Sequence, residues 1–180
     1  YYNATAYLNK KNELHKVSED SLAKIFLSED YLSPTLGKLL FGEVINLMIP
    51  FRGSIEKFDR AVELEKSWEH GYDKITNKND GNMFSTDFRK IYCDRTNYPA
   101  LFINTTEVES GLQCWVTNVR ADSLPLGSSR DLLKSKIKGN INYSTAINFS
   151  DRFPLISPSG MLSQDDSRKF HYVDGGYVEN

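Results

Sequence analysis

The residues best suited to chemistry lie at the end of the chain, in the stretch RKFHYVDGGYVEN (168–180), where Asp174 precedes Gly175 and Gly176. A carboxylate at the C-terminal end of a strand can face a crevice and act as a general base, and glycines allow backbone and ligand to approach closely. Asp-Gly between apolar runs is also typical of a tight hairpin turn. These residues alone support the catalytic and the hairpin interpretation equally.

The rest of the sequence offers no metal site. Cys93 and Cys114 are separated by 20 residues and have no His or Cys partners at zinc-site spacing, which favours free thiols, with a disulfide between them left open. Asp165 and Asp166 belong to the polar segment SQDDSRK, which is typical of a solvated loop. We therefore expect neither a metal nor a cofactor.

A serine nucleophile is also missing from the expected motif. Acyl-transfer enzymes expose it in a G-x-S-x-G elbow, and the nearest segments, GSSRD (127–131) and SPSGM (157–161), lack one or both glycines. Side chains alternate along a strand, so His171 should face away from Asp174 and cannot complete a triad with it. A dyad in which the carboxylate itself takes the serine proton is the simpler expectation.

Composition describes an ordinary globular protein. The 180 residues suit one domain, with 39% hydrophobic and 26% charged residues. Because 22 Lys and Arg oppose 24 Asp and Glu, the chain lacks the positive charge that phosphate-backbone binding needs, and we expect no nucleic-acid partner. No apolar run reaches the length of a spanning helix. The start on YYNATAYLNKK, without Met, suggests a piece of a longer protein.

The first half predicts helices, from about residue 18 to 75. Residues 18–27 begin with Ser18 as N-cap and two acidic residues in the first turn. Residues 33–49 offer Ser33 as N-cap and an almost wholly apolar body, which predicts a buried helix, with a lipid-facing surface as the alternative. Residues 54–75 have the clearest amphipathic period in the chain.

The second half predicts a strand-rich region, from about residue 99 to 180. Two neighbouring strands joined by a tight turn are expected at 99–106 and 112–119, and a third at 169–173, running into Asp174. Two short helices are also expected, one from Ser129 and one ending before Pro154. Helices first and strands later indicate a mixed α/β domain.

Several segments of the chain together carry a family resemblance. RFPLISPSG followed by FHYVDGGYVEN is similar to the C-terminal part of bacterial patatin-like phospholipase domains, where a strand delivers a D-G-G motif and then an Asn, matched here by Asn180. DYLSPTLGKLLF (30–41), KFDRAVELEKSWE (57–69) and LFINTTEVESG (101–111) are similar to the longer bacterial members. The resemblance runs from about residue 28 to the end, and four segments in the right order make it more specific than D-G-G alone.

The resemblance implies that residues 1–180 form the C-terminal part of a patatin-like three-layer α/β domain. It implies a lipid acyl hydrolase with a Ser-Asp dyad, in which Asp174 is catalytic and Gly175 and Gly176 shape the active-site turn. The partner would be a lipid or ester substrate, and the parent protein would be bacterial, cytoplasmic or membrane-associated.

The chain departs from the family pattern because it lacks the nucleophile elbow and the glycine-rich oxyanion loop. We expect both to lie outside these residues and the chain alone to be inactive. The alternative is a non-catalytic patatin-like scaffold or binding module that contacts a partner or membrane. A fragment of a sheet should also expose an edge, through which we expect oligomers to form.

Overall fold

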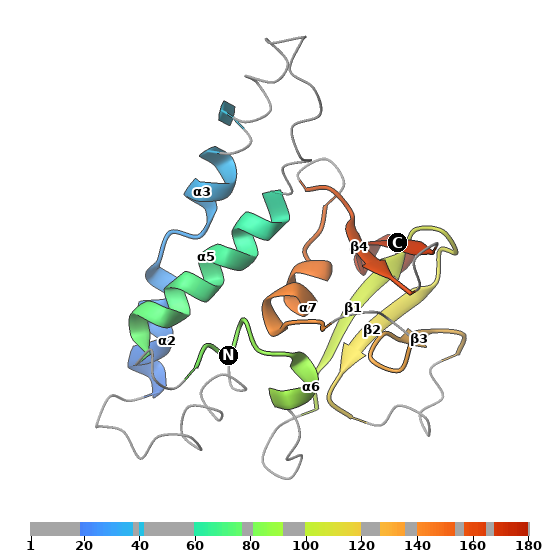
Figure 1. Cartoon of the computed structure of the whole chain (residues 1–180), viewed down its shortest axis with the longest axis horizontal. Helices are drawn as coiled ribbons and strands as arrows, with labels where there is room; N and C mark the ends of the chain where they lie inside the picture. Colours follow the sequence, from blue (N-terminus) through green and yellow to red (C-terminus); the bar gives the residue numbers. More distant parts are fainter. Residues whose placement is uncertain are drawn as a thin grey trace.

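The computed structural model describes most of the chain, and the statements below concern these described residues: 19–37, 40–41, 60–76, 81–91, 100–119, 127–135, 140–153, 157–164 and 168–179. Helices precede strands along the chain, as predicted (Figure 1). The helices are α2 (Glu19–Ser28), α3 (Leu32–Gly37), α5 (Arg60–Ile75), α6 (Phe88–Ile91), α7 (Tyr143–Phe149) and α8 (Gly176–Glu179). The strands are β1 (Phe102–Glu107), β2 (Gln113–Thr117), β3 (Arg130–Asp131), β4 (Gly160–Ser163) and β5 (Lys169–Asp174).

The five strands form one mixed sheet in the order β3-β2-β1-β5-β4. β1 and β2 are antiparallel neighbours joined by a tight turn, with Thr105 opposite Cys114, which confirms the predicted pair. β5 lies between β1 and β4 and is antiparallel to both, and β3 is parallel to β2. The α/β fold class and the order of helices before strands are therefore confirmed.

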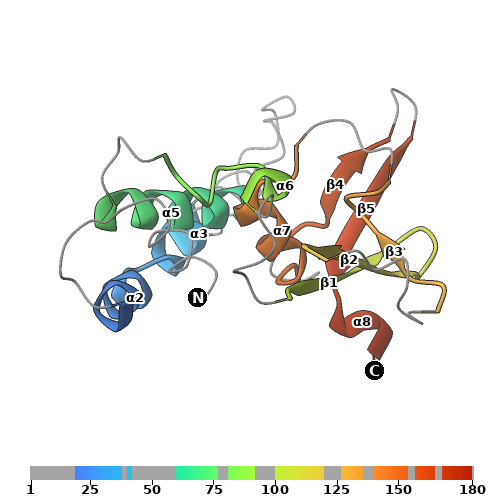
Figure 2. The same ribbon diagram turned by 90° about the horizontal axis from the view of Figure 1, so that it is seen from below.

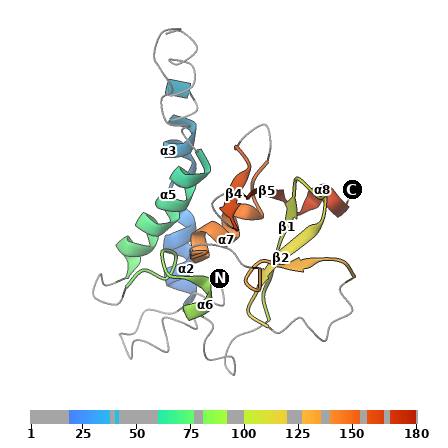
Figure 3. The same cartoon turned by 45° about the vertical axis from the view of Figure 1, so that its right-hand side comes forward.

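Helices α2, α3, α5 and α7 are layered on one side of the sheet. Figure 2 shows α7 between α5 and the sheet, with α8 on the opposite side, and Figure 3 shows the same separation from another direction. α7 contacts β1 and β5, α5 contacts α7, and α2 and α3 pack along α5. None of the helices in the described part of the chain is long and apolar enough to cross a membrane.

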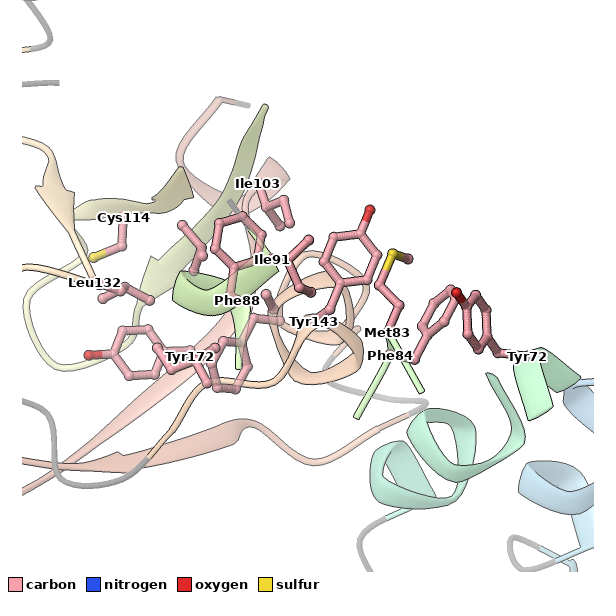
Figure 4. Packing of buried hydrophobic residues seen from close by; sticks show 14 residues of the cluster. Tyr72, Met83, Phe84, Phe88, Ile91, Ile103, Cys114, Leu132, Tyr143 and Tyr172 are labelled. Carbon is pink, nitrogen blue, oxygen red and sulfur yellow. The ribbon is translucent and has the colours of Figure 1, made fainter. Parts of the chain in front are cut away.

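The core fills the space between α7 and the sheet and reaches α5 (Figure 4). Phe149 of α7 packs on Tyr172 of β5, with ring centroids 5.6 Å apart. Phe84 connects this core to the helices, because its ring centroid lies 5.4 Å from that of Tyr143 and 5.6 Å from that of Tyr72 of α5. One continuous core thus joins the sheet to the helical layer.

Two expectations about helices are wrong. No residue of α3 is buried and Leu36 is 48% exposed, because α3 contacts mainly α5 rather than entering the core. Its N-terminal cap is Asp30, whose Oδ1 accepts the N–H groups of Leu32 and Ser33, so Ser33 is not the cap. The rest of the predicted helix 33–49, and the start of the one at 54–75, lie largely outside the described residues.

The helix predicted from Ser129 is replaced by a strand. Arg130 and Asp131 pair with β2 as β3, and the next N–H, that of Leu132, donates to the Trp115 carbonyl at 2.8 Å. The ladder to β2 satisfies backbone groups that a short isolated helix would leave to solvent. β4 was not predicted at all, whereas the helix ending before Pro154 is present as α7.

Candidate functional site

Asp174 is the last residue of β5 and is held through its backbone by three neighbours. It lies opposite Thr105 of β1, and its N–H donates to the Arg152 carbonyl at 3.0 Å. Its own carbonyl accepts the Thr106 hydroxyl at 3.1 Å. The side chain is half-buried, and Oδ1 accepts the Gly176 N–H at 2.8 Å. The carboxylate is thus fixed where the strand gives way to α8.

The two glycines after Asp174 do not form a hairpin. The chain continues into α8, and neither Gly175 nor Gly176 adopts positive φ, so the hairpin interpretation is wrong. Gly175 is buried, and a Cβ there would lie 2.7 Å from Cβ and 3.0 Å from the carbonyl carbon of Asn104. Gly176 has room for a side chain. Close approach to β1 therefore requires glycine only at position 175.

Asp151 is a second carboxylate brought near Asp174 by the fold. It follows α7 in the segment whose Arg152 carbonyl binds the N–H of Asp174. Partial desolvation, and then the charge of Asp174, raise the pKa of Asp151 above its ordinary value. Sequence spacing did not single out this pair. No cluster of three or more metal-ligating side chains occurs among the described residues, so the pair is no evident metal site.

Two exposed aromatic residues follow the two carboxylates closely along the chain. Phe153 follows Asp151 by two residues and Tyr177 lies on α8, and they are 52% and 50% exposed. Their ring centroids are 6.1 Å apart. The two rings thus form a small exposed apolar surface at the segments that carry Asp151 and Asp174.

Arg152 anchors the segment that binds Asp174. Its side chain is only 4% exposed, and the guanidinium lies 5.7 Å from the centre of the Phe149 ring. Nη1 donates to the Pro158 carbonyl at 2.9 Å, and Nη2 lies 3.5 Å from Glu65 Oε1 on α5. One buried cation thus connects α5, the end of α7 and the approach to β4.

Glu65 is the centre of a polar contact between α5 and α7. Its Oε1 accepts the Asn148 amide at 2.6 Å, and its Oε2 accepts the Thr145 hydroxyl at 2.8 Å. One turn further along α5, Glu69 accepts the Ser144 hydroxyl at 2.7 Å. The sequence contained a signal for this contact, because Glu65 and Glu69 follow the inward-facing Ala61 at helical spacing.

His171 points away from Asp174, as strand alternation predicted. Its Nδ1 lies 2.6 Å from Glu109 Oε1, and its backbone N–H also donates to that carboxylate. Partial desolvation opposes ionisation of Glu109, but the hydrogen bonds from His171 outweigh it and lower the pKa of Glu109. The structure therefore does not bring His171 and Asp174 together into a triad.

Two hollows lie elsewhere on the sheet. A wide one of about 650 Å³ is lined on the His171 side of β5 by residues that include Val108, Val173 and Tyr177. A smaller one of about 240 Å³ lies at the other end of β5. Asp174 lines neither of these two, so a crevice at Asp174 stays a prediction. No serine hydroxyl in the described part of the chain donates to its carboxylate.

The remaining sequence-predicted groups add no chemistry to the site. Cys114 is a free, fully buried thiol, and desolvation, followed by the charge of Glu107, raises its pKa to about 11, so it stays protonated. Cys93, Asn180 and the pair Asp165-Asp166 lie outside the described residues.

Comparison with known proteins identifies no family for this chain. No family model, no curated protein and no solved structure matches this chain.

Proposed function

We propose that this chain supplies the general base of a serine lipid acyl hydrolase of the patatin-like type, with Asp174 as that base. The observation that carries the proposal is the placement of Asp174. Its carboxylate is half-buried at the C-terminal end of an interior strand and oriented by the Gly176 N–H, and its backbone is fixed by β1 and by Arg152. A base in a rigid, partly desolvated position of this kind suits proton abstraction.

In the proposed reaction, a serine from outside these 180 residues attacks the carbonyl carbon of a lipid ester. Asp174 takes the hydroxyl proton as the bond from serine oxygen to carbon forms, and then gives that proton to the alcohol that leaves. Water repeats the sequence and releases the fatty acid from the serine. We assign the acyl chain to the exposed apolar surface of Phe153 and Tyr177, which pack on each other.

The proposal requires a longer protein that carries a G-x-S-x-G element, and the experiment is an ester-hydrolysis assay on that protein. Asp174→Asn keeps an oxygen that can accept the Gly176 N–H but removes the proton acceptor, so kcat should fall by roughly a hundredfold to ten-thousandfold. Asp151→Asn is the matched control, because it removes the neighbouring carboxylate and should leave kcat within a few-fold. Full activity in a folded Asp174→Asn protein would end the assignment. The 180-residue chain alone should show no turnover of a p-nitrophenyl ester.

A second candidate, a binding module that contacts a partner or membrane, is favoured by one surface. Leu32, Leu36 and Leu40 follow each other at four-residue spacing and are 61%, 48% and 58% exposed. An apolar row of this kind on a surface is typical of an interaction site. Cosedimentation with phosphatidylcholine vesicles tests it: the binding module predicts binding that Leu36→Ser weakens, whereas the hydrolase alone predicts no such dependence.

A further inference from the structure

The smaller hollow lies at the start of β5, away from Asp174. With a rise of about 3.3 Å per residue, its wall residue Phe170 is roughly 13 Å along the strand from Asp174. Between these two positions on β5, Tyr172 packs on Phe149 of α7. The lining residues are Arg130, Ser135, Gln164, Arg168, Phe170 and Tyr172, and we call this place the Arg130–Arg168 hollow. None of these described lining residues is acidic.

Arg130 is held in a fixed orientation that leaves donors available. Its Nη1 lies 2.7 Å from Oε2 of Glu107. The Glu107 side chain is 2% exposed, and its Oε1 accepts the Ser110 hydroxyl. A guanidinium has five N–H donors in a planar fork, and this contact uses one side of it. The Arg130 side chain is 42% exposed, so its remaining N–H groups can reach a ligand in the hollow.

Tyr172 brings a hydroxyl to the same place. The residue is 2% exposed, and Figure 4 shows its oxygen on the side of the ring turned away from the other core rings. Tyr172 lines the hollow, and its hydroxyl makes no hydrogen bond with the described residues, so its O–H is available to a ligand there. Desolvation, and then the charge of Glu107, raise the pKa of Tyr172, so the phenol keeps its proton and can donate.

We propose that the Arg130–Arg168 hollow binds a phosphate group, with the two guanidinium groups and the Tyr172 hydroxyl donating to its oxygens. Guanidinium forks match phosphate geometry, and donors from several elements suit an anion with several oxygens better than a flat carboxylate. The Gln164 amide adds a further donor to the wall, which also contains Ser135, whose hydroxyl donates to the Asp131 carbonyl at 3.2 Å. A volume of about 240 Å³ limits the ligand to a phosphate with a small substituent, such as a glycerol phosphate.

This site is separate from the proposed catalysis and does not depend on it. Its ligand is either a soluble phosphoester or the phosphate headgroup of a lipid, and both present the same chemistry to the hollow. The test therefore has one arm for each source, and both use the whole 180-residue chain.

In the first arm, glycerol 3-phosphate is titrated into the protein by calorimetry at fixed ionic strength. Arg168→Gln and Tyr172→Phe should each weaken binding at least about tenfold, the usual effect of losing a hydrogen bond to a charged group. Lys169→Gln is the matched control, since it removes a neighbouring positive charge that lies outside the lining of the hollow, and it should bind as the wild type does. Arg130 is left intact because its loss would leave the buried Glu107 carboxylate without its cation.

In the second arm, phosphatidylcholine vesicles with and without phosphatidic acid are sedimented with the same variants. Saturable binding of glycerol 3-phosphate assigns the site to a soluble phosphoester. Binding only to vesicles with phosphatidic acid, lost in Arg168→Gln and Tyr172→Phe but kept in Lys169→Gln, assigns it to a lipid headgroup. Tyr172→Phe keeps the ring packing and removes only an unpaired hydroxyl, so it should fold. The proposal is overturned by a lack of binding in both arms, or by binding that survives either substitution.

Discussion

Helix α7 is held on its two sides by opposite kinds of contact. Toward α5 the contact is polar: Glu65 and Glu69 accept hydrogen bonds from the side chains of Ser144, Thr145 and Asn148. Toward the sheet it is apolar, with Phe149 packed on Tyr172. The apolar side should carry most of the stability, because area removed from water contributes more than hydrogen bonds that replace bonds to water.

The polar side has a different role, since it determines orientation. Hydrogen bonds require particular partners and angles, whereas apolar contacts tolerate sliding. The Glu65 contact ends at Arg152, whose carbonyl binds the N–H of Asp174. We therefore expect that loss of the apolar contact between α7 and the sheet destabilises the whole chain. Loss of the polar contact between α7 and α5 should in addition displace the segment around Asp174.

The largest effect is expected from Phe149→Ala, which removes the main ring between α7 and the sheet. Phe149 is 1% exposed, so the change leaves a cavity and should lower the free energy of unfolding by about 3–5 kcal/mol. Urea unfolding followed by circular dichroism measures it. Phe153→Ala is the control, because that ring is 52% exposed and its loss should matter little. Equal losses in the two variants would contradict the assignment of stability to the sheet side.

The polar side is broken by Glu65→Ala. The change leaves the buried Asn148 amide and the Arg152 guanidinium without their carboxylate, so stability should fall by about 2–3 kcal/mol. Lys66→Ala, which disrupts an exposed pair with Glu63 on the same helix, should cost less than about 1 kcal/mol. The Asp174 amide resonance should shift in Glu65→Ala but not in Lys66→Ala, and an unmoved resonance would refute the orienting role.

Gly160→Ala should disturb both sides at once. A Cβ at this position would lie 2.3 Å from Cε1 of Phe149 and 2.9 Å from Nε of Arg152, so both buried side chains must move. Overpacking of this kind costs about 1–3 kcal/mol. Gly37→Ala offers a control with nothing within 4 Å of the added carbon. A thermal midpoint unchanged by Gly160→Ala would show that this region is loosely packed.

The smallest effect concerns Asp151, at the end of α7 where the two sides meet. Its native pKa is raised, so the folded state holds the proton more tightly than the unfolded chain, whose pKa is about 3.9. Stability attributable to Asp151 therefore falls as pH rises from the unfolded pKa through the native one. Asp151→Asn should remove this loss, with a gain within about 0.5 kcal/mol at neutral pH.

The cause of this shift can be tested directly by NMR titration of the Asp151 carboxyl. Asp174→Asn removes the neighbouring charge and should lower the pKa of Asp151, leaving only the part that desolvation causes. An unchanged pKa would mean that the two carboxylates do not interact.

Much of the fold was predictable because it depends on local pattern. Helical spacing identified α2 and α5, and alternation with β-favouring residues identified β1, β2 and β5. β3 and β4 were missed because both are short and lie at the sheet edges, so their pairing rather than their composition creates them. The apolar residues of α3 predicted burial, but what an apolar residue contacts depends on its neighbours in space.

For the candidate site, the sequence by itself determined that Asp174 ends a strand and that His171 points away from it, because both follow from the two-residue period of a strand. Only the tertiary structure decided that Gly175 packs against Asn104 instead of turning a hairpin, and that Asp151 and Arg152 approach Asp174. These contacts join residues from separate elements, and their energies exist only once the strands have paired and α7 has packed. No local pattern can encode them.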